Sequence, residues 1–174
     1  MGIWTGIFTY PRRWTFGALA AHGGCLYACG GTDGRLSLAD AGRLRHGTGK
    51  WESLPPMAIP RWGAAAGATP AGDVVVCGGF RSCGPGPQQP ATAVECFRSA
   101  PGLWEMLADA APSHHSFPGA VVSGGHLYVL GGASQQGTTA SAERLDLESE
   151  TWERLPPMPE PLIGSAYAAF PPQN

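Results

Sequence analysis

The stretch that decides the fold is Val129-Leu130-Gly131-Gly132, followed after twelve residues by the segment 145–158, which reads LDLESETWERLPPM. Its pattern of strand, glycine pair, second strand and tryptophan occurs three times. The three copies are Gly30-Gly31 with Trp51, Gly78-Gly79 with Trp104, and Gly131-Gly132 with Trp152. The second glycine and the tryptophan are 20, 25 and 20 residues apart, and successive glycine pairs are 48 and 53 apart. The chain is therefore built from internal repeats.

A repeat of about fifty residues with a double glycine and a later tryptophan is typical of one blade of a β-propeller. We therefore expect an all-β chain with three four-stranded antiparallel blades and the first strand of a fourth. Each blade is stabilised by stacking against its neighbours. We expect repeats at 11–59, 60–111 and 112–160, and the opening strand of a fourth repeat at 161–174. The N-terminal segment at 1–10 fits either the last strand of a preceding blade or a frayed terminus.

Composition excludes several other classes of protein. Glycine and proline make up about a quarter of the chain, but 43% hydrophobic and only 14% charged residues argue against a disordered chain. The net charge of −2 and the lack of a basic block give no attraction to nucleic acid or anionic lipid. There is no apolar run long enough to span a membrane, and no signal-peptide pattern. We expect a cytoplasmic protein, with the nucleus as the alternative.

Five cysteines are present, but their positions do not suggest metal or redox chemistry. Cys29 and Cys77 stand just before their glycine pairs, where the third repeat has Leu130. This equivalence predicts small core residues, and no Cys-x-x-Cys spacing occurs. We expect neither a metal nor a cofactor.

The repeated residues themselves are expected to be structural. Two glycines at the end of a strand permit positive φ angles and the close approach of the next strand. The tryptophans are large enough to fill the space between adjacent blades. Val74-Val75-Val76-Cys77 is continuously apolar, as suits a strand covered on both faces. A glutamate follows each tryptophan, and we expect it to be an outward-facing strand charge.

Together these residues resemble the kelch repeat, which has a double glycine, an aromatic residue followed by an acid, and a tryptophan seven residues after that aromatic. The resemblance covers residues 11–160. Phe97 keeps the aromatic and Asp146 the acid, whereas Leu44-Arg45 in the first repeat departs from both. The resemblance implies blades whose first strand is innermost, five to seven of which close a ring.

Candidate binding residues lie where each repeat opens and just after each glycine pair, because these two places share one rim in an antiparallel blade. The positions 17 residues before the glycine pairs are occupied by Arg13, Arg61 and His114. The segments that follow the pairs contain Asp33, Arg81 and Ser134. Two arginines and a histidine at equivalent positions suit an acidic peptide or another anion. The alternative is that these are ordinary solvated loop residues.

The function we expect is non-enzymatic recognition of a protein or peptide. The resemblance implies a rim that binds short partner motifs, as in the substrate-recognition part of ubiquitin ligase adaptors of the BTB-kelch kind. The BTB and BACK domains of such adaptors are not in this sequence. Because three blades do not close a ring, we expect a fragment or short isoform of a longer protein, or self-association through open blade edges.

The alternative is a propeller enzyme or enzyme fragment, since similar propellers include copper oxidases and sugar isomerases. An oxidase site needs histidine, tyrosine and cysteine converging at one end of the channel. Tyr27 and Tyr128 occupy equivalent strand positions and form no rim cluster with histidines. Neighbouring His114 and His115 point to opposite faces of a strand and cannot hold one ion there. A third alternative is a short isoform with no function of its own.

Overall fold

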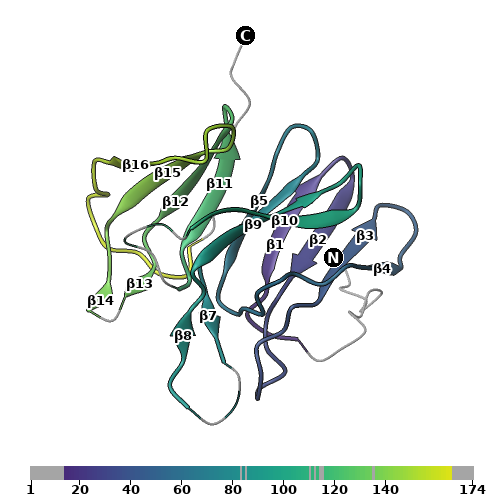
Figure 1. Cartoon of the computed structure of the whole chain (residues 1–174), viewed down its shortest axis with the longest axis horizontal. Helices are drawn as coiled ribbons and strands as arrows, with labels where there is room; N and C mark the ends of the chain where they lie inside the picture. Colours follow the sequence, from purple (N-terminus) through teal and green to yellow (C-terminus); the bar gives the residue numbers. More distant parts are fainter. Residues whose placement is uncertain are drawn as a thin grey trace, which may run out of the picture.

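The computed structural model describes residues 14–165 except residues 83, 85, 110, 112, 114, 115 and 135, and all regular structure in this part of the chain is β (Figure 1). Three four-stranded antiparallel sheets lie side by side, and each is made from one repeat. The sequence-based prediction of three four-stranded blades is confirmed. Among the described residues no helix could span a membrane.

Each sheet is a simple meander in which the first strand of the repeat lies at one side and the fourth at the other. The first sheet has β1 (Ala18–His22), β2 (Cys25–Cys29), β3 (Ala41–Arg45) and β4 (Trp51–Leu54). The second has β5 (Ala65–Ala68), β6 (Val74–Cys77), β9 (Ala93–Arg98) and β10 (Leu103–Asp109). The third has β11 (Gly119–Ser123), β12 (His126–Leu130), β15 (Ala142–Asp146) and β16 (Trp152–Leu155).

The three first strands, β1, β5 and β11, contact one another in order and form the inner side of the array. Two short hairpins follow the second and third glycine pairs and project from the lower edge in Figure 1. They are β7 (Phe80–Arg81) with β8 (Gln89–Pro90), and β13 (Ala133–Ser134) with β14 (Gly137–Thr138). The innermost position of the first strand, which the resemblance implied, agrees with this arrangement.

The apolar core lies between the sheets, in two separate layers. Val74 and Val76 of β6 pack toward the first sheet, whereas Val75 and Cys77 pack toward the third. All four side chains are buried, because the second sheet is covered on both faces. The continuous apolar run in this strand is thus explained by its place between two neighbours.

Trp104 and Trp152 each join their sheet to the sheet before it. Trp104 packs on the layer between the first and second sheets and donates a hydrogen bond from Nε1 to the carbonyl oxygen of Pro55, 2.8 Å away. Trp152 does the same one sheet later, with Asp109 as the acceptor at 2.9 Å. Replacing a packed tryptophan with alanine typically costs about 3–5 kcal/mol. Trp104 and Trp152 are therefore inter-blade packing residues, whereas the same role for Trp51 stays a prediction.

The glycine pairs are required by backbone geometry. The φ angles of Gly30 and Gly31 are 67° and 103°, and those of Gly131 and Gly132 are 64° and 97°. A Cβ atom on Gly30 would lie 2.4 Å from the carbonyl oxygen of Arg61, where the next repeat passes. The amide of Gly31 donates to that same oxygen at 2.7 Å. The second pair, Gly78-Gly79, has φ angles of 68° and 89°.

The glutamates after the tryptophans lie on the outer strands and pair with arginines of the neighbouring strand. Arg43 and Arg45 both bind Glu52, at 2.7 and 3.1 Å. The other two pairs are Arg98 with Glu105 at 2.7 Å and Arg144 with Glu153 at 2.6 Å. All three carboxylates are well exposed, so these are surface ion pairs of small energetic weight.

Several predictions fall on residues outside the described part of the chain. They concern the segment 1–10, Arg13, His114, His115 and most of the fourth opening strand within 161–174. Of that fourth unit, Gly164 is described. It has a φ of 66° and its amide donates to the carbonyl oxygen of Phe117 at 2.9 Å. The unit boundaries taken from the sequence stay predictions.

Candidate functional site

One edge of the array carries the loops that open each repeat together with the segments that follow each glycine pair. Single β-bridges join the two kinds of segment in every repeat, as the antiparallel order requires. They are Thr15 with Thr32, Trp62 with Phe80, and Ser116 with Ala133. We call this edge the rim. It lies opposite the turns that join β1 to β2 and β11 to β12.

Arg61 was predicted to project from the rim toward a partner, and in this respect the prediction is wrong. Its side chain is completely buried. One Nη atom lies 2.7 Å from the carboxylate of Glu95, and the other donates to the carbonyl oxygen of Ala93 at 2.8 Å. A buried guanidinium needs such partners, because an unpaired buried charge is very costly. The side chain of Arg61 therefore stabilises the second sheet from within and is not available to a ligand.

Glu95 explains why Arg61 is drawn inward. Its carboxylate also accepts hydrogen bonds from the amides of Ala58 and Ile59, at 2.6 and 3.1 Å. It therefore holds the middle of the segment that links β4 to β5. In the third repeat Glu143 occupies the same position and accepts a hydrogen bond from the hydroxyl of Ser113 at 2.7 Å. The first repeat has Gly42 at this position.

Three of the predicted rim residues do lie on the rim. Asp33 is exposed, and its Oδ1 accepts hydrogen bonds from the amides of Arg35 and Leu36, both at 2.9 Å. These backbone bonds lower the pKa of Asp33 below its usual value, so the carboxylate stays charged. Arg81 is exposed on β7, and Ser134 is half-buried on β13. Arg13 and His114 lie outside the described residues.

The most conspicuous feature of the rim is a cluster of four aromatic rings, which the repeat pattern of the sequence did not predict. Its members, which we call the aromatic quartet, are Phe16, Trp62, Phe80 and Phe117. The ring of Trp62 is central, with centroids 5.5 to 5.7 Å from the other three, and Phe16 and Phe117 are 5.8 Å apart. Phe16 is 60% exposed, and the others are half-buried. The quartet combines residues from all three repeats.

The backbone brings these rings together. Phe16 and Phe117 have φ angles of 55° and 48°, in the left-handed region that large side chains rarely adopt. Gly63 is the equivalent residue of the second repeat, with a φ of 63°. The amide of Gly63 donates to the carbonyl oxygen of Phe16 at 2.8 Å, and the amide of Phe117 donates to that of Gly63 at 2.6 Å. We call this series, which continues to Gly164, the rim ladder.

Gly63 also makes room for the quartet. A Cβ atom there would lie 2.9 Å from the ring of Phe117. The sequence did contain one signal for the cluster, because Phe16 and Phe117 both stand 14 residues before their glycine pairs. Nothing in the sequence showed that these positions converge on Trp62.

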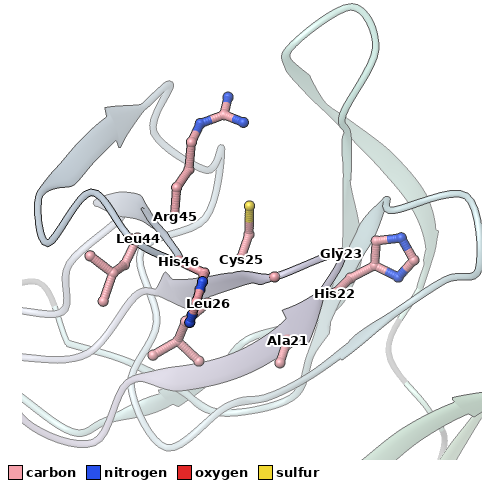
Figure 2. A pocket seen from close by; sticks show the side chains of 10 residues that line it. Ala21, His22, Gly23, Cys25, Leu26, Leu44, Arg45 and His46 are labelled. Carbon is pink, nitrogen blue, oxygen red and sulfur yellow. The ribbon is translucent and has the colours of Figure 1, made fainter.

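A cavity lies at the other edge of the first sheet, beside the turn at Gly23-Gly24. It has a volume of about 620 Å³, and its walls include Ala21, Leu26 and Leu44. In Figure 2 the thiol of Cys25 and the guanidinium of Arg45 point to the same side, as expected for residues paired across two strands. No group of three or more histidines, cysteines, aspartates or glutamates within the described ranges could hold a metal ion.

The stacked four-stranded meanders, whose first strands lie next to one another on the inner side, define the chain as a set of β-propeller blades. The kelch motif family matches residues 13–58 and 114–159, which is more than half of the chain. The chain therefore belongs to the kelch-repeat family.

Known relatives agree with this assignment. Kelch repeat protein C2 of vaccinia virus (strain Western Reserve) is 33% identical over 113 residues, which are 65% of this chain and 21% of that protein. The cowpox virus protein of the same name is 32% identical over the same length and the same shares. The chain thus spans about a fifth of the length of these relatives. The solved structure of YjhT superposes with a TM-score of 0.76 at 17% identity, covering 88% of this chain and 54% of that one, and supports the fold alone.

Proposed function

We propose that this chain is a non-enzymatic protein-interaction module that binds a protein or peptide partner at the rim. The observation that supports the proposal is the contrast between repeated and non-repeated positions. The glycine pairs and tryptophans recur and serve the fold, whereas the rim segments that follow the glycines differ in every repeat and are more exposed. Loops that vary on a rigid scaffold are the usual place for recognition. Kelch-repeat membership supports the same function.

The rim charges favour an acidic partner. Arg35 and Arg81 are both exposed there, and Asp33, two residues before Arg35, is an exposed carboxylate of the same rim. The side chain of Asp33 is already engaged by two backbone amides, so it contributes less to a ligand. Arginine recognises carboxylates through paired hydrogen bonds. The overall charge of −2 supports a protein rather than a nucleic acid as partner.

The test uses a random 12-residue peptide library displayed on phage and selected on the full chain. Peptides recovered are synthesised, and their affinity is measured by fluorescence polarisation. We expect Arg81→Glu to weaken binding at least tenfold, because it reverses a rim charge. The matched control is Lys50→Glu, which reverses an exposed charge at the opposite edge and leaves affinity unchanged. Equal affinity for both variants and the parent chain, or a loss in the control instead, counts against a rim site.

A finer proposal is that the chain is the substrate-recognition part of a ubiquitin ligase adaptor of the BTB-kelch kind and acts in the cytoplasm. Kelch-repeat membership and the rim described above support it. A tagged full chain in cells, followed by fractionation and cross-linking, provides the measurement. Because the BTB and BACK domains are not in this sequence, we expect the cytosolic fraction to yield the chain cross-linked to a protein that a cullin-type ligase ubiquitinates. A chain that stays in another compartment, or whose cross-linked partners are not substrates of such a ligase, contradicts the proposal.

Self-association is a second candidate, supported by two equivalent sheet faces. Leu26 and Leu44 are paired on the outer face of the first sheet and are half-buried. Their counterparts in the second sheet, Val74 and Phe97, are covered by the first sheet and fully buried. At the far end Tyr128 lies half-buried at the position where Tyr27 packs into an inter-sheet layer. These faces suit head-to-tail contact between copies of the chain.

Light scattering measures this directly. We expect the mass of the purified chain to exceed that of a monomer, and Leu44→Glu to reduce it to the monomer mass. A monomeric parent chain with cooperative unfolding contradicts self-association and leaves the rim proposal intact.

A further inference from the structure

We propose that the aromatic quartet is the anchor point of the rim, and that it takes an aromatic side chain of a linear peptide whose flanking residues are acidic. This inference rests on the proposed function, since it assigns the partner class of the same rim. It is carried by the geometry of the four rings, by the backbone conformation of two of them, and by the charges around them.

The rings form a platform that a further ring can join. Trp62 is contacted by Phe16, Phe80 and Phe117 at tilted or edge-on angles, with interplanar angles from 42° to 73°. Aromatic pairs prefer such tilted and edge-to-face arrangements. Phe16, at 60% exposure, leaves a large part of its ring in contact with solvent. Exposed aromatic clusters of this kind are the usual anchors of protein interfaces.

The fold itself does not require these rings. The positions of Trp62 and Phe80 are filled by Thr15 and Thr32 in the first repeat, and the same β-bridge forms there without aromatic side chains. The third repeat makes the bridge with a serine and an alanine. The aromatic residues of the second repeat are thus additional to the architecture.

Phe16 and Phe117 are unfavourable for the backbone that carries them. Both hold a left-handed conformation at a position where the second repeat has Gly63. Glycine adopts this conformation freely, whereas a residue with a Cβ atom is strained in it. Strained conformations of large residues concentrate at functional sites. Two phenylalanines at such positions, on the same rim and in contact with each other, point to a ligand that uses their rings.

The surroundings of the quartet decide what kind of side chain enters. Ring faces also attract cations, but Arg35 and Arg81 bring positive charge to the rim. The loop that carries Arg35 is tied to the loop that follows Phe80, because the hydroxyl of Ser37 accepts a hydrogen bond from the amide of Ser82 at 2.7 Å. A cationic ligand is repelled there. An uncharged aromatic anchor with acidic neighbours satisfies both the rings and the arginines.

The experiment extends the phage selection described above. We expect the peptides selected on the full chain to share one tryptophan, tyrosine or phenylalanine flanked by aspartate or glutamate. Phe16→Gly places the residue of the second repeat at the equivalent backbone position, so we expect the fold to be kept. It should weaken binding of these peptides at least tenfold. Phe16→Asn, which also tolerates the left-handed conformation, should give the same loss. Leu103→Ala, at an exposed apolar residue on the opposite edge, is the matched control.

The outcomes separate this inference from the proposed function. Acidic peptides without an aromatic position, lysine-rich peptides, or aromatic peptides whose affinity is unchanged in both Phe16 variants overturn the inference. If such peptides still lose affinity in Arg81→Glu, the rim remains the binding site and the proposed function stands. Peptides that are insensitive to every rim variant, or failure to select any, count against both. Circular dichroism confirms that each variant is folded before its affinity is compared.

Discussion

Replacing Glu95 tests the view that a buried ion pair, rather than a ligand, accounts for the arginine at residue 61. The carboxylate of Glu95 faces one charged donor and two backbone amides, all within 3.1 Å. Glu95→Gln leaves the guanidinium of Arg61 buried without a counter-charge. An arginine keeps its charge in proteins, so the protein cannot relieve the cost by releasing a proton. Removing one partner of a buried pair costs about 3–5 kcal/mol.

The assay is urea unfolding followed by tryptophan fluorescence and circular dichroism. A loss of about 3 kcal/mol is a large part of the 5–15 kcal/mol that stabilises a typical domain. We expect the midpoint to fall sharply in Glu95→Gln, with an unchanged slope. Glu105→Gln is the matched control, because it removes the partner of Arg98 in an exposed ion pair of the same sheet. Such a pair contributes about 1 kcal/mol or less.

The double variant Arg61→Met, Glu95→Gln completes the cycle. We expect it to lose less stability than the two single variants together, because it leaves no unpaired buried charge. If Glu95→Gln changes stability no more than Glu105→Gln does, Arg61 is not held by a buried ion pair, and its side chain is available to a ligand at the rim.

Three further predictions concern the fold. Gly30→Ala should destabilise the chain by more than about 1 kcal/mol, because the φ angle of Gly30 is 67° and the new Cβ atom would lie 2.4 Å from a carbonyl oxygen. The control is Gly86→Ala, which should leave stability unchanged in the same urea assay, because a Cβ atom there would have no atom within 4 Å. Burial raises the pKa of Cys77 to about 12, so its thiol should react slowly with iodoacetamide at pH 8. Peptide mass mapping should show that half-buried Cys25 is modified well before Cys77. Equal rates of modification would contradict the burial of Cys77. For Asp73 burial raises the pKa, but hydrogen bonds from a backbone amide, a serine hydroxyl and an arginine outweigh it and lower the pKa below 3.8. The stability this contributes is therefore present above about pH 4 and lost as the pH falls through the lowered pKa, a loss that Asp73→Asn should abolish in acid titrations followed by circular dichroism.

The sequence predicted the repeated parts of the fold well, for a physical reason. Gly131 and Trp152 each meet a requirement that is local to one repeat or its neighbour, namely a left-handed backbone or an inter-sheet contact. Such requirements recur with the period of the chain, and so the residues recur with it. The four-stranded sheets and the inner position of β1, β5 and β11 follow from the same regularity.

The candidate site was predicted less well, because it depends on single residues that do not recur. The equivalent positions of Arg61 and His114 indicated a shared edge but gave no depth, and the depth of Arg61 is set by Glu95, 34 residues further along. A glutamate nine residues before the tryptophan in two of the three repeats was the available signal. The quartet depends on Gly63 being small enough to admit the ring of Phe117, which no pattern of one repeat reveals.

The rim ladder has a consequence for how this surface can change over evolutionary time. The rim ladder is made only of main-chain groups, namely amides and carbonyl oxygens of Phe16, Gly63 and Phe117. Its hydrogen bonds, and the spacing of neighbouring blades that they set, therefore do not depend on the identity of the side chains. Glycine and phenylalanine already occupy it side by side. Mutations can therefore replace the side chains of the rim one blade at a time. New binding specificities can arise in this way while the fold beneath the rim is inherited unchanged.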